Sequence, residues 1–395
     1  MKKPINASSI SRCTAMVPLP AIMLPNHLSV KRLSKSRLGM QPVNNGDASD
    51  LVVQQGDLVI GSGWHPALFR AEVSALTSNV DESLTPRVLR VKNSKGLEKA
   101  ATVDQILQKF GTSTTERLDN DFSDWLEVNA LSIDQSVAVR WSRHGERTSK
   151  GIELAKRMGE ILCSNGFRIE LEEPEQTIQL LISGSDLFWG IPQLSEPPRK
   201  EWKNRVATQR PFFKPVSLDP QHARLMINLT GNGGPVLDPM CGTGGLLIEA
   251  ALMGFDCTGV DLDPEMVEGS KKNLQWCGGH AKVIHGDATQ LVKLELSGFR
   301  SVCFDPPYGR NAWRSDSILN LFTSVLNSIH SVCEDNAAMC CMLPADVEQV
   351  NVMGMEWKKM KKLFGKTGWQ INGDWKIPVH ASLSRRLVRA VRIPV

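Results

Sequence analysis

The chain has 395 residues, enough for two or three compact domains, with the 41% hydrophobic and 22% charged content of an ordinary globular protein. No stretch approaches the run of about 20 apolar residues that crosses a bilayer, so we expect no membrane span. Its nine cysteines form no C-x-x-C pair, which argues against a zinc ribbon or a thioredoxin-type site. We therefore expect no metal site, and buried free thiols in a reducing cytoplasm.

Positive charge is concentrated at the beginning of the chain. The first 50 residues hold seven basic and two acidic side chains, whereas the net charge of the whole chain is +4. The remaining residues are thus close to neutral. Any nucleic acid must be bound there by local basic patches and not by bulk charge.

Residues 1–50 contain five prolines and no sustained hydrophobic period. We interpret them as a disordered tail, with two alternatives. A start that contains Ser and Arg and few acids resembles an organellar transit peptide. The true start could also be a later methionine: Met16, Met23 or Met40.

Folded protein is predicted from Leu51 onward. Leu51–Val53 and Leu58–Ile60 are typical of strands, and Pro66–Leu76 has the spacing of a helix. Residues 101–110 and 121–128 carry helical or mixed patterns.

A strand, a helix and two more strands are predicted over residues 136–182. Residues 136–141 alternate apolar and polar side chains, residues 149–163 have helical spacing, and Gly166 is a typical helix end. Residues 168–171 and 177–182 are the further strands. A group of basic residues near the beginning of this segment forms a candidate RNA-binding surface, although such groups are also typical of a solvated face: Arg140, Arg143, Arg147 and Lys150.

The second half of the chain alternates strands and helices, which predicts an α/β fold with a parallel sheet covered on both faces. The strands are predicted at residues 236–238, 256–261, 282–285, 302–304 and 337–343, and the helices at residues 244–253, 264–276 and 318–332.

A glycine-rich turn joins the first strand and helix of this half. Gly242 and Gly244 let the backbone approach a ligand closely, at the edge where an open α/β sheet binds its ligand. A dinucleotide fingerprint needs a third glycine where this chain has Leu247, so a pyrophosphate is the weaker interpretation. Asp238, before the glycines, suits a cationic ligand such as the aminoacyl end of S-adenosylmethionine.

Two more acids end the next two strands. Asp261 lies 17 residues after Gly244, close to the spacing of a carboxylate that binds ribose hydroxyls. Asp287 follows the third strand, where it could accept a hydrogen bond from an adenine amino group. Three acids at three consecutive strand ends predict an S-adenosylmethionine site. The expected cofactor-binding residues are Asp238, Gly242, Thr243, Gly244, Asp261, Leu262, Asp287 and Ala288.

The tetrapeptide Asp305–Tyr308 follows the fourth strand. An exocyclic purine amine is a poor nucleophile because its lone pair is delocalised into the ring. The Asp305 carboxylate and the Pro306 carbonyl can accept its two hydrogens, and Tyr308 offers a face to a base that has left its stack. The predicted catalytic residues are Asp305, Pro306, Pro307 and Tyr308.

These motifs resemble those of the archaeal tRNA guanine-10 N2-methyltransferases and their eukaryotic counterparts. The similarity extends to residues 210–220, 223–229 and 379–385. Residues 136–193 resemble the THUMP domain, the RNA-binding module of these enzymes. The resemblance implies a Rossmann-like class I methyltransferase domain at residues 216–395, preceded by a ferredoxin-like domain at 51–135, the THUMP domain and a linker at 194–215. The tail, residues 1–50, departs from the family pattern.

The resemblance also implies a reaction. The methyl group would pass from S-adenosylmethionine to the exocyclic amino group of a tRNA guanosine, with position 10 as the first expectation, giving N2-methylguanosine or, after a second transfer, N2,N2-dimethylguanosine. The implied partners are tRNA and, as in some members, a small zinc-containing activating subunit, with no membrane or DNA, in the cytoplasm. Asp305 favours position 10, since relatives that act on position 6 tend to have asparagine there.

Three alternatives remain: methylation of another tRNA position, methylation of DNA, and an inactive fold that only binds RNA. DNA amino-methyltransferases share the clamp tetrapeptide, but nothing in this sequence indicates the domain with which they read duplex bases. An inactive copy would have lost acids or clamp residues, and this chain has all of them.

Overall fold

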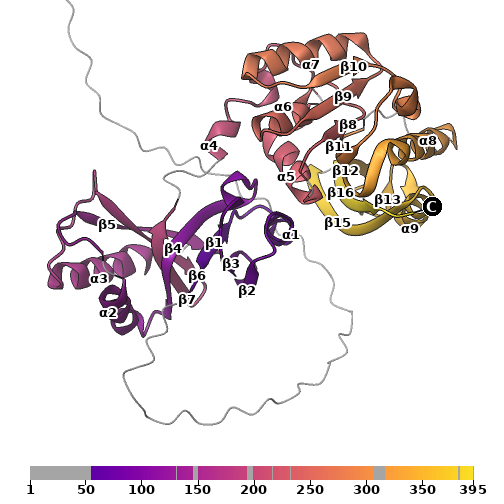
Figure 1. The fold of residues 1–395 in the computed structure, drawn as a ribbon. Coiled ribbons are helices and arrows are strands. Elements are labelled where there is room, and N and C mark those ends of the chain that lie inside the picture. The colour runs from indigo at the N-terminus through magenta and orange to yellow at the C-terminus, as the bar shows by residue number, and fades with distance from the viewer. Residues whose placement is uncertain are drawn as a thin grey trace, which may run out of the picture. The chain divides into compact units, whose positions relative to one another are not determined.

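The computed structural model describes residues 55–129, 131–145, 150–193, 199–215, 217–231, 233–306, 316–380 and 383–394 (Figure 1). The predicted tail, residues 1–50, and the predicted strand Leu51–Val53 lie outside these ranges. Among the helices described, none has the length and hydrophobicity that crossing a bilayer requires.

Within these ranges, the first half of the chain forms a seven-stranded sheet. β4 (Val103–Thr114) pairs with β1 on one side and with β7 on the other, so the sheet continues across the domain boundary predicted at residue 135. That division stays a prediction. In sheet order the strands are β2 (Val80–Thr85), β3 (Val88–Val91), β1 (Asp57–Gly61), β4, β7 (Asp186–Pro192), β6 (Gln176–Ser183) and β5 (Val137–His144).

The strand–helix–strand unit predicted over residues 136–182 is confirmed. β5 and β6 are parallel, and α3 (Lys150–Ser164) connects them. Leu154, Met158 and Leu162, spaced by four, form the buried face of α3. α2 (Leu118–Val128), which contains the predicted segment 121–128, packs into the same core.

Two segments of this half differ from the secondary structure that the sequence predicts. Residues 101–110, with their helical or mixed pattern, lie largely in β4, where Lys109 at φ 47° and a shift in pairing interrupt the alternation. Residues 168–171 form no strand, only a bridge from Ile169 to Val137. Ile169 packs against the core of this half, whereas Leu171 is 61% exposed.

The second half forms a sheet in the order β10-β9-β8-β11-β12-β16-β15. The first five strands are parallel, β16 runs antiparallel to both of its neighbours, and every strand predicted from residue 236 onward is present. The strands are β8 (Val236–Asp238), β9 (Cys257–Asp261), β10 (Lys282–His285), β11 (Phe299–Phe304), β12 (Cys333–Ala345), β15 (Trp369–His380) and β16 (Leu383–Arg392), with a hairpin of β13 (Asn351–Val352) and β14 (Met355–Glu356) at the end of β12.

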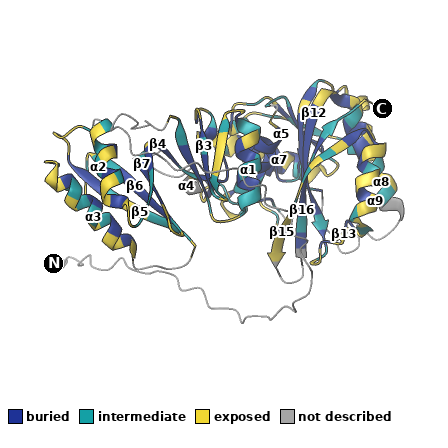
Figure 2. Ribbon diagram, turned by 90° about the horizontal axis from the view of Figure 1, so that it is seen from below, coloured by how far each residue is buried: buried dark blue, intermediate teal, exposed yellow. Residues whose placement is uncertain are grey.

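Helices cover both faces of this sheet, whose central strands are buried (Figure 2). One core contains Leu225, Leu247 and Leu274 and therefore brings α5, α6 and α7 to one face, while Phe322 and Phe364 place α8 and α9 on the other. The helices are α5 (Pro220–Thr230), α6 (Gly245–Leu252), α7 (Pro264–Cys277), α8 (Asp316–Val332) and α9 (Trp357–Lys366).

The described part of the predicted linker is packed against the second sheet's helices. It contains α4 (Arg199–Trp202), followed by a segment that lies on α7. The backbone N–H and carbonyl of Phe212 both bond to the Asn273 side chain, at 2.9 and 2.8 Å. The Phe212 ring fills the space beside Gly269, where an added Cβ would lie 2.0 Å from it.

A buried carboxylate lies where α1 (Pro66–Leu76) packs on α5. Glu72 accepts hydrogen bonds from the backbone N–H groups of Ala101 at 2.7 Å and Thr102 at 2.8 Å, and from Asn228 Nδ2 of α5 at 2.7 Å. Burial raises the pKa of Glu72, although these hydrogen bonds lower it. The donors satisfy a carboxylate that would otherwise be costly to bury.

Candidate active site

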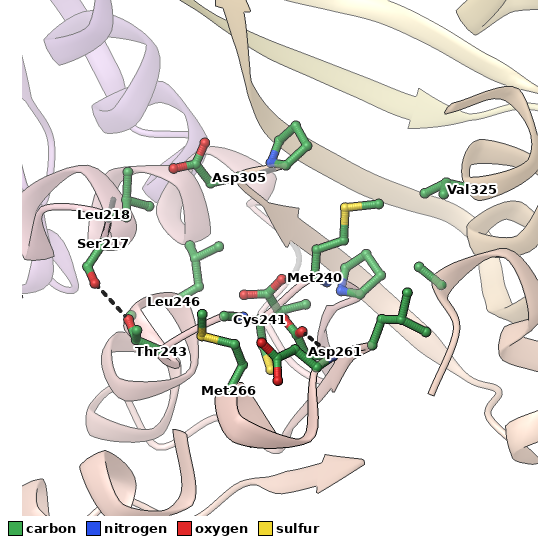
Figure 3. A pocket seen from close by; sticks show the side chains of 18 of the residues that line it. Ser217, Leu218, Met240, Cys241, Thr243, Leu246, Asp261, Met266, Asp305 and Val325 are labelled. Carbon is green, nitrogen blue, oxygen red and sulfur yellow. Dashed lines mark hydrogen bonds between the residues drawn. The ribbon is translucent and has the colours of Figure 1, made fainter. Parts of the chain in front are cut away.

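A cavity of about 580 Å³ opens at the carboxyl ends of the parallel strands (Figure 3). β8 lies between β9 and β11, so the strand order reverses at this point, which is where open α/β sheets bind their ligands. The lining combines apolar side chains, among them Met240, Met266 and Leu321, with the carboxylates of Asp238, Asp261, Asp287 and Asp305.

The glycine-rich turn between β8 and α6 forms one wall of this cavity. Gly242 and Gly244 have φ values of 50° and 80°, in the left-handed region that glycine adopts without strain. Gly242 and Thr243 line the cavity, whereas Gly244 lies behind them as the residue that caps α6. Thr243 is held by a 3.0 Å hydrogen bond to the Ser217 hydroxyl (Figure 3).

Asp261, at the end of β9, holds this turn in place. Its Oδ2 accepts from the Gly242 N–H at 2.7 Å, and its Oδ1 accepts from the Asp263 N–H at 3.0 Å. Each carboxylate oxygen has a second lone pair, so Asp261 can still accept from a ligand. Leu262, which follows it, also lines the cavity and is 70% exposed.

Asp287 and Ala288 line the cavity from the segment after β10. Asp287 caps the short 3-10 helix Ala288–Leu294: its Oδ1 accepts from the Thr289 N–H and hydroxyl, both at 2.8 Å. The bond from the Thr289 N–H is the main reason that the pKa of Asp287 is lowered. This capping role adds to the ligand contact that the sequence predicts.

Asp238 is the most deeply buried of the cavity acids that the sequence predicts for the cofactor. It is 2% exposed, and its Oδ1 accepts from the Met240 N–H at 3.1 Å. Burial raises the pKa of Asp238 well above the usual value, and the negative charges of Asp261 and Asp305 raise it further. Acids in such surroundings favour a cation in the space between them.

Asp305 follows β11 directly and projects into the same cavity as Asp261 (Figure 3). Its side chain is 9% exposed and accepts a hydrogen bond from Arg385 Nη1 of β16 at 3.2 Å. Burial raises the pKa of Asp305 to about 7, although the charge and the hydrogen bond of Arg385 both lower it. Asp305 is therefore close to its titration midpoint at neutral pH.

The rest of the predicted clamp is only partly described. Pro306 is buried and lines the cavity beside Asp305. Pro307 and Tyr308 lie outside the described residues.

Two of the predicted RNA-binding residues lie on β5, the edge strand of the first sheet. Arg140 and Arg143 are both on β5, but side chains three residues apart on a strand point to opposite faces of the sheet. Arg140 is exposed and donates a hydrogen bond to the Leu171 carbonyl, and Lys150 is exposed at the beginning of α3. Arg147 lies outside the described residues.

Arg385 is a site residue that the sequence did not predict. It is 80 residues from Asp305, and the antiparallel pairing of β16 with β12 brings the two together. Lys214 and Met266 also line the cavity without having been predicted. The only sequence signal for Arg385 is its place in the segment 379–385, which takes part in the family resemblance.

Comparison with known proteins identifies the family to which the chain is similar. The family model of the RMKL-like methyltransferase domain matches residues 207–371. The chain is 33% identical over 334 residues to the tRNA (guanine(10)-N2)-dimethyltransferase of Pyrococcus abyssi, which covers 82% of this chain and 95% of that protein. It is 32% identical over 305 residues to the enzyme of the same name from Methanothermobacter thermautotrophicus, covering 73% of this chain and 88% of that protein.

A protein named for a different position is less similar. The tRNA (guanine(6)-N2)-methyltransferase of Methanocaldococcus jannaschii is 22% identical over 315 residues, covering 67% of this chain and 77% of that protein. The order of the catalytic sheet, the glycine-rich turn and the acids at the strand ends agree with the class I methyltransferase fold, whose cofactor is S-adenosylmethionine. With 33% identity over nearly the whole length of a named relative, this chain belongs to the family of the S-adenosylmethionine-dependent tRNA (guanine-N2)-methyltransferases.

Proposed function

We propose that this enzyme methylates the N2 amino group of guanosine 10 in tRNA. The observation that carries the proposal is the position of Asp305. This buried acceptor lies at the end of β11, in the same cavity as the glycine-rich turn and the acids of the predicted cofactor site. Two relatives named for guanine 10 are 33% and 32% identical to this chain, against 22% for one named for guanine 6.

The cavity residues fit S-adenosylmethionine. The buried acid Asp238 and the half-buried acid Asp261 suit the positive charges of its aminoacyl and sulfonium groups. In our proposal Asp261 also accepts from the ribose hydroxyls, and Asp287 accepts from the adenine amino group. Gly242, Thr243, Leu262 and Ala288 supply backbone and apolar contacts, and Gly244 keeps the turn in shape.

S-adenosylmethionine supplies an electrophilic methyl group when it is bound. The task of the protein is then to hold the guanine amine in line with that methyl group. We assign the two amino hydrogens to the Asp305 carboxylate and the Pro306 carbonyl, and the stacking of the base to Tyr308 on a loop stiffened by Pro307. An ionised Asp305 accepts without donating, so it orients the amine and can take up the proton that the nitrogen loses.

The N-terminal half has the role of holding tRNA in this proposal. Residues 136–193 resemble a THUMP domain, and Arg140, Arg143, Arg147 and Lys150 are the proposed contacts to phosphates. The products are N2-methyl- and N2,N2-dimethylguanosine. A small zinc-containing activating subunit and a cytoplasmic location remain predictions of the sequence.

Methylation of matched tRNA transcripts tests the proposal. One transcript carries guanosine at position 10 and the other carries inosine, which differs only in lacking the 2-amino group. We expect labelled methyl transfer to the first and loss of nearly all transfer to the second. Equal labelling of both would refute position 10, and labelling of duplex DNA in preference to tRNA would favour the alternative DNA enzyme.

A further inference from the structure

We propose that helix α9 carries a second RNA-binding surface, on the catalytic domain itself. This surface, the lysine face, consists of Lys358, Lys359, Lys361, Lys362 and Lys366. The inference rests on the proposed function, because the partner is the sugar–phosphate backbone of the substrate tRNA. Neither the glycine-rich turn nor the basic residues of the N-terminal half belong to it.

The lysine face carries five positive charges within ten residues. All five side chains are exposed, and the helix contains no acidic residue. Among the ion pairs between described residues, none joins any of these five lysines. Two acids lie close to the beginning of α9 in sequence or space: Glu356 precedes it, and Asp374 accepts a hydrogen bond from Trp357 Nε1 at 3.2 Å and lies 4.0 Å from Arg386.

The other side of α9 fixes the helix to the catalytic core. Met360 and Phe364 are fully buried, and Phe364 packs edge-to-face on Phe322 of α8. The Trp357 ring packs under the Arg386 guanidinium, 4.4 Å from the ring centroid. Because the apolar side is anchored in this way, the lysine face is presented to solvent on a rigid support.

The connectivity brings the beginning of α9 to the catalytic edge of the sheet. β11 and β12 are parallel, so their carboxyl ends, and therefore Asp305, lie at the same edge. The β13–β14 hairpin pairs with the last residue of β12, Ala345, and leads directly into α9. The turn between β12 and β13 also contacts Arg385, which bonds to Asp305: Gln349 Nε2 donates a hydrogen bond to the Arg385 carbonyl at 3.1 Å.

The charge arrangement is unfavourable for the isolated protein and favourable for binding a polyanion. Lys358 and Lys362, and Lys362 and Lys366, are like-charge pairs four residues apart, an arrangement that destabilises a helix. Lys358 and Lys359 also lie in the first turn, where the helix dipole is positive and anions are stabilising. Phosphates placed along the helix would relieve both effects, and releasing their counterions would add affinity.

Charge reversal with a matched control tests the proposal in the full chain. The test variant is Lys358→Glu/Lys362→Glu. The control is Lys272→Glu/Lys282→Glu, two exposed lysines of α7 and β10 with the same change in net charge. Binding of an unmodified tRNA transcript is measured by fluorescence over a range of salt concentrations, and S-adenosylmethionine binding by calorimetry.

We expect the test variant to weaken tRNA binding by about tenfold or more near 0.1 M salt, and to lower the salt slope by about 1–2. The control should change either quantity much less, and both variants should keep their affinity for S-adenosylmethionine. Lys358→Gln/Lys362→Gln, which removes charge without reversing it and spares the helix new acids, should give an intermediate loss.

Two results would overturn the proposal: unchanged tRNA affinity in the test variant, or equal losses in test and control. Failure of the proposed function has a different signature. In that case the unmodified chain would bind tRNA through the lysine face but transfer no methyl group to guanosine.

Discussion

Asp287 and Asp305 both follow parallel strands and both line the cavity, but their carboxylates have different surroundings. The backbone N–H and hydroxyl of Thr289 solvate Asp287 and keep its pKa low. Asp305 is buried beside Arg385, and burial raises its pKa to about 7. At neutral pH the first acid is therefore ionised, while the second changes its charge within the range where an enzyme normally works.

Asp305→Asn should gain stability relative to the unmodified chain as the pH rises. An aspartate with a folded-state pKa of about 7 retains, in the folded chain, a proton that the unfolded chain has lost above about pH 4. This contribution stabilises the folded chain at low pH and is lost as the pH rises through about 7. Between about pH 5 and about pH 8, the unfolding free energy of the unmodified chain should fall by about 2–3 kcal/mol more than that of the variant. Denaturant titrations at both pH values measure this, and equal changes would mean that Asp305 has an ordinary pKa.

Arg385→Ala should move the pH dependence of turnover upward. Arg385 lowers the pKa of Asp305 by its charge and its hydrogen bond, so its removal leaves more of the acid protonated at neutral pH. We expect turnover near pH 7 to fall about tenfold, with much of the loss recovered above about pH 8. Arg385→Lys keeps the charge and should restore part of the original midpoint. A loss of the same size at every pH would assign Arg385 a purely structural role.

The acids of the site could be predicted from sequence because each lies at the end of a strand or within two residues after it. Asp238 and Asp261 lie at the last positions of β8 and β9, and parallel strands bring their carboxyl ends to one edge. The ion pair of Asp305 with Arg385 could not be predicted in this way. It depends on the register of β16 against β12, and a strand pairing between distant segments leaves no local pattern.

At the scale of elements, the catalytic half was easier to predict than the rest. Its parallel strands are short apolar runs between helices with clear spacing, so residues 236–343 were assigned to the correct types of element. α9 was missed, since five of its ten residues are lysines and only a narrow stripe around Met360 and Phe364 is apolar. β2, β3 and β7 were missed as well: the side chains of β2 are mostly exposed, and β3 and β7 are short buried runs without an alternating pattern.

Two glycines in helices should respond in opposite ways to alanine. Gly269→Ala in α7 would place a Cβ 2.0 Å from the Phe212 ring, so the segment on α7 must shift, which typically costs about 1–3 kcal/mol. That segment leads to Lys214 and Leu218 of the cavity, so S-adenosylmethionine binding should also weaken.

Gly365→Ala in α9 is the matched control. No atom lies within 4 Å of the added Cβ, and alanine is the better helix former by about 0.5–1 kcal/mol, so this variant should be more stable. Thermal and denaturant unfolding measure both changes. A stabilised Gly269→Ala variant would show that Phe212 does not hold the segment on α7.

At the scale of the whole molecule, the basic side chains and the acidic cavity lie on different segments of the chain. The part after residue 50 is close to neutral in total, so its contacts with tRNA depend on where its basic side chains lie. The edge strand β5 and the lysine face of α9 are two such places, one in each half. The acidic cavity lies between the ends of β8, β9 and β11, where phosphates would be repelled and a cationic cofactor attracted.

The most direct test of the account identifies the product nucleoside. The full chain, and its Asp305→Ala variant, are incubated with an unmodified tRNA transcript and labelled S-adenosylmethionine, and the digested RNA is analysed by mass spectrometry. We expect the label in N2-methylguanosine or N2,N2-dimethylguanosine, and a loss of about 100-fold or more in the variant, which should still bind the cofactor. Label in a methylated adenosine or on a ring nitrogen of guanosine, or full turnover by Asp305→Ala, would contradict the account.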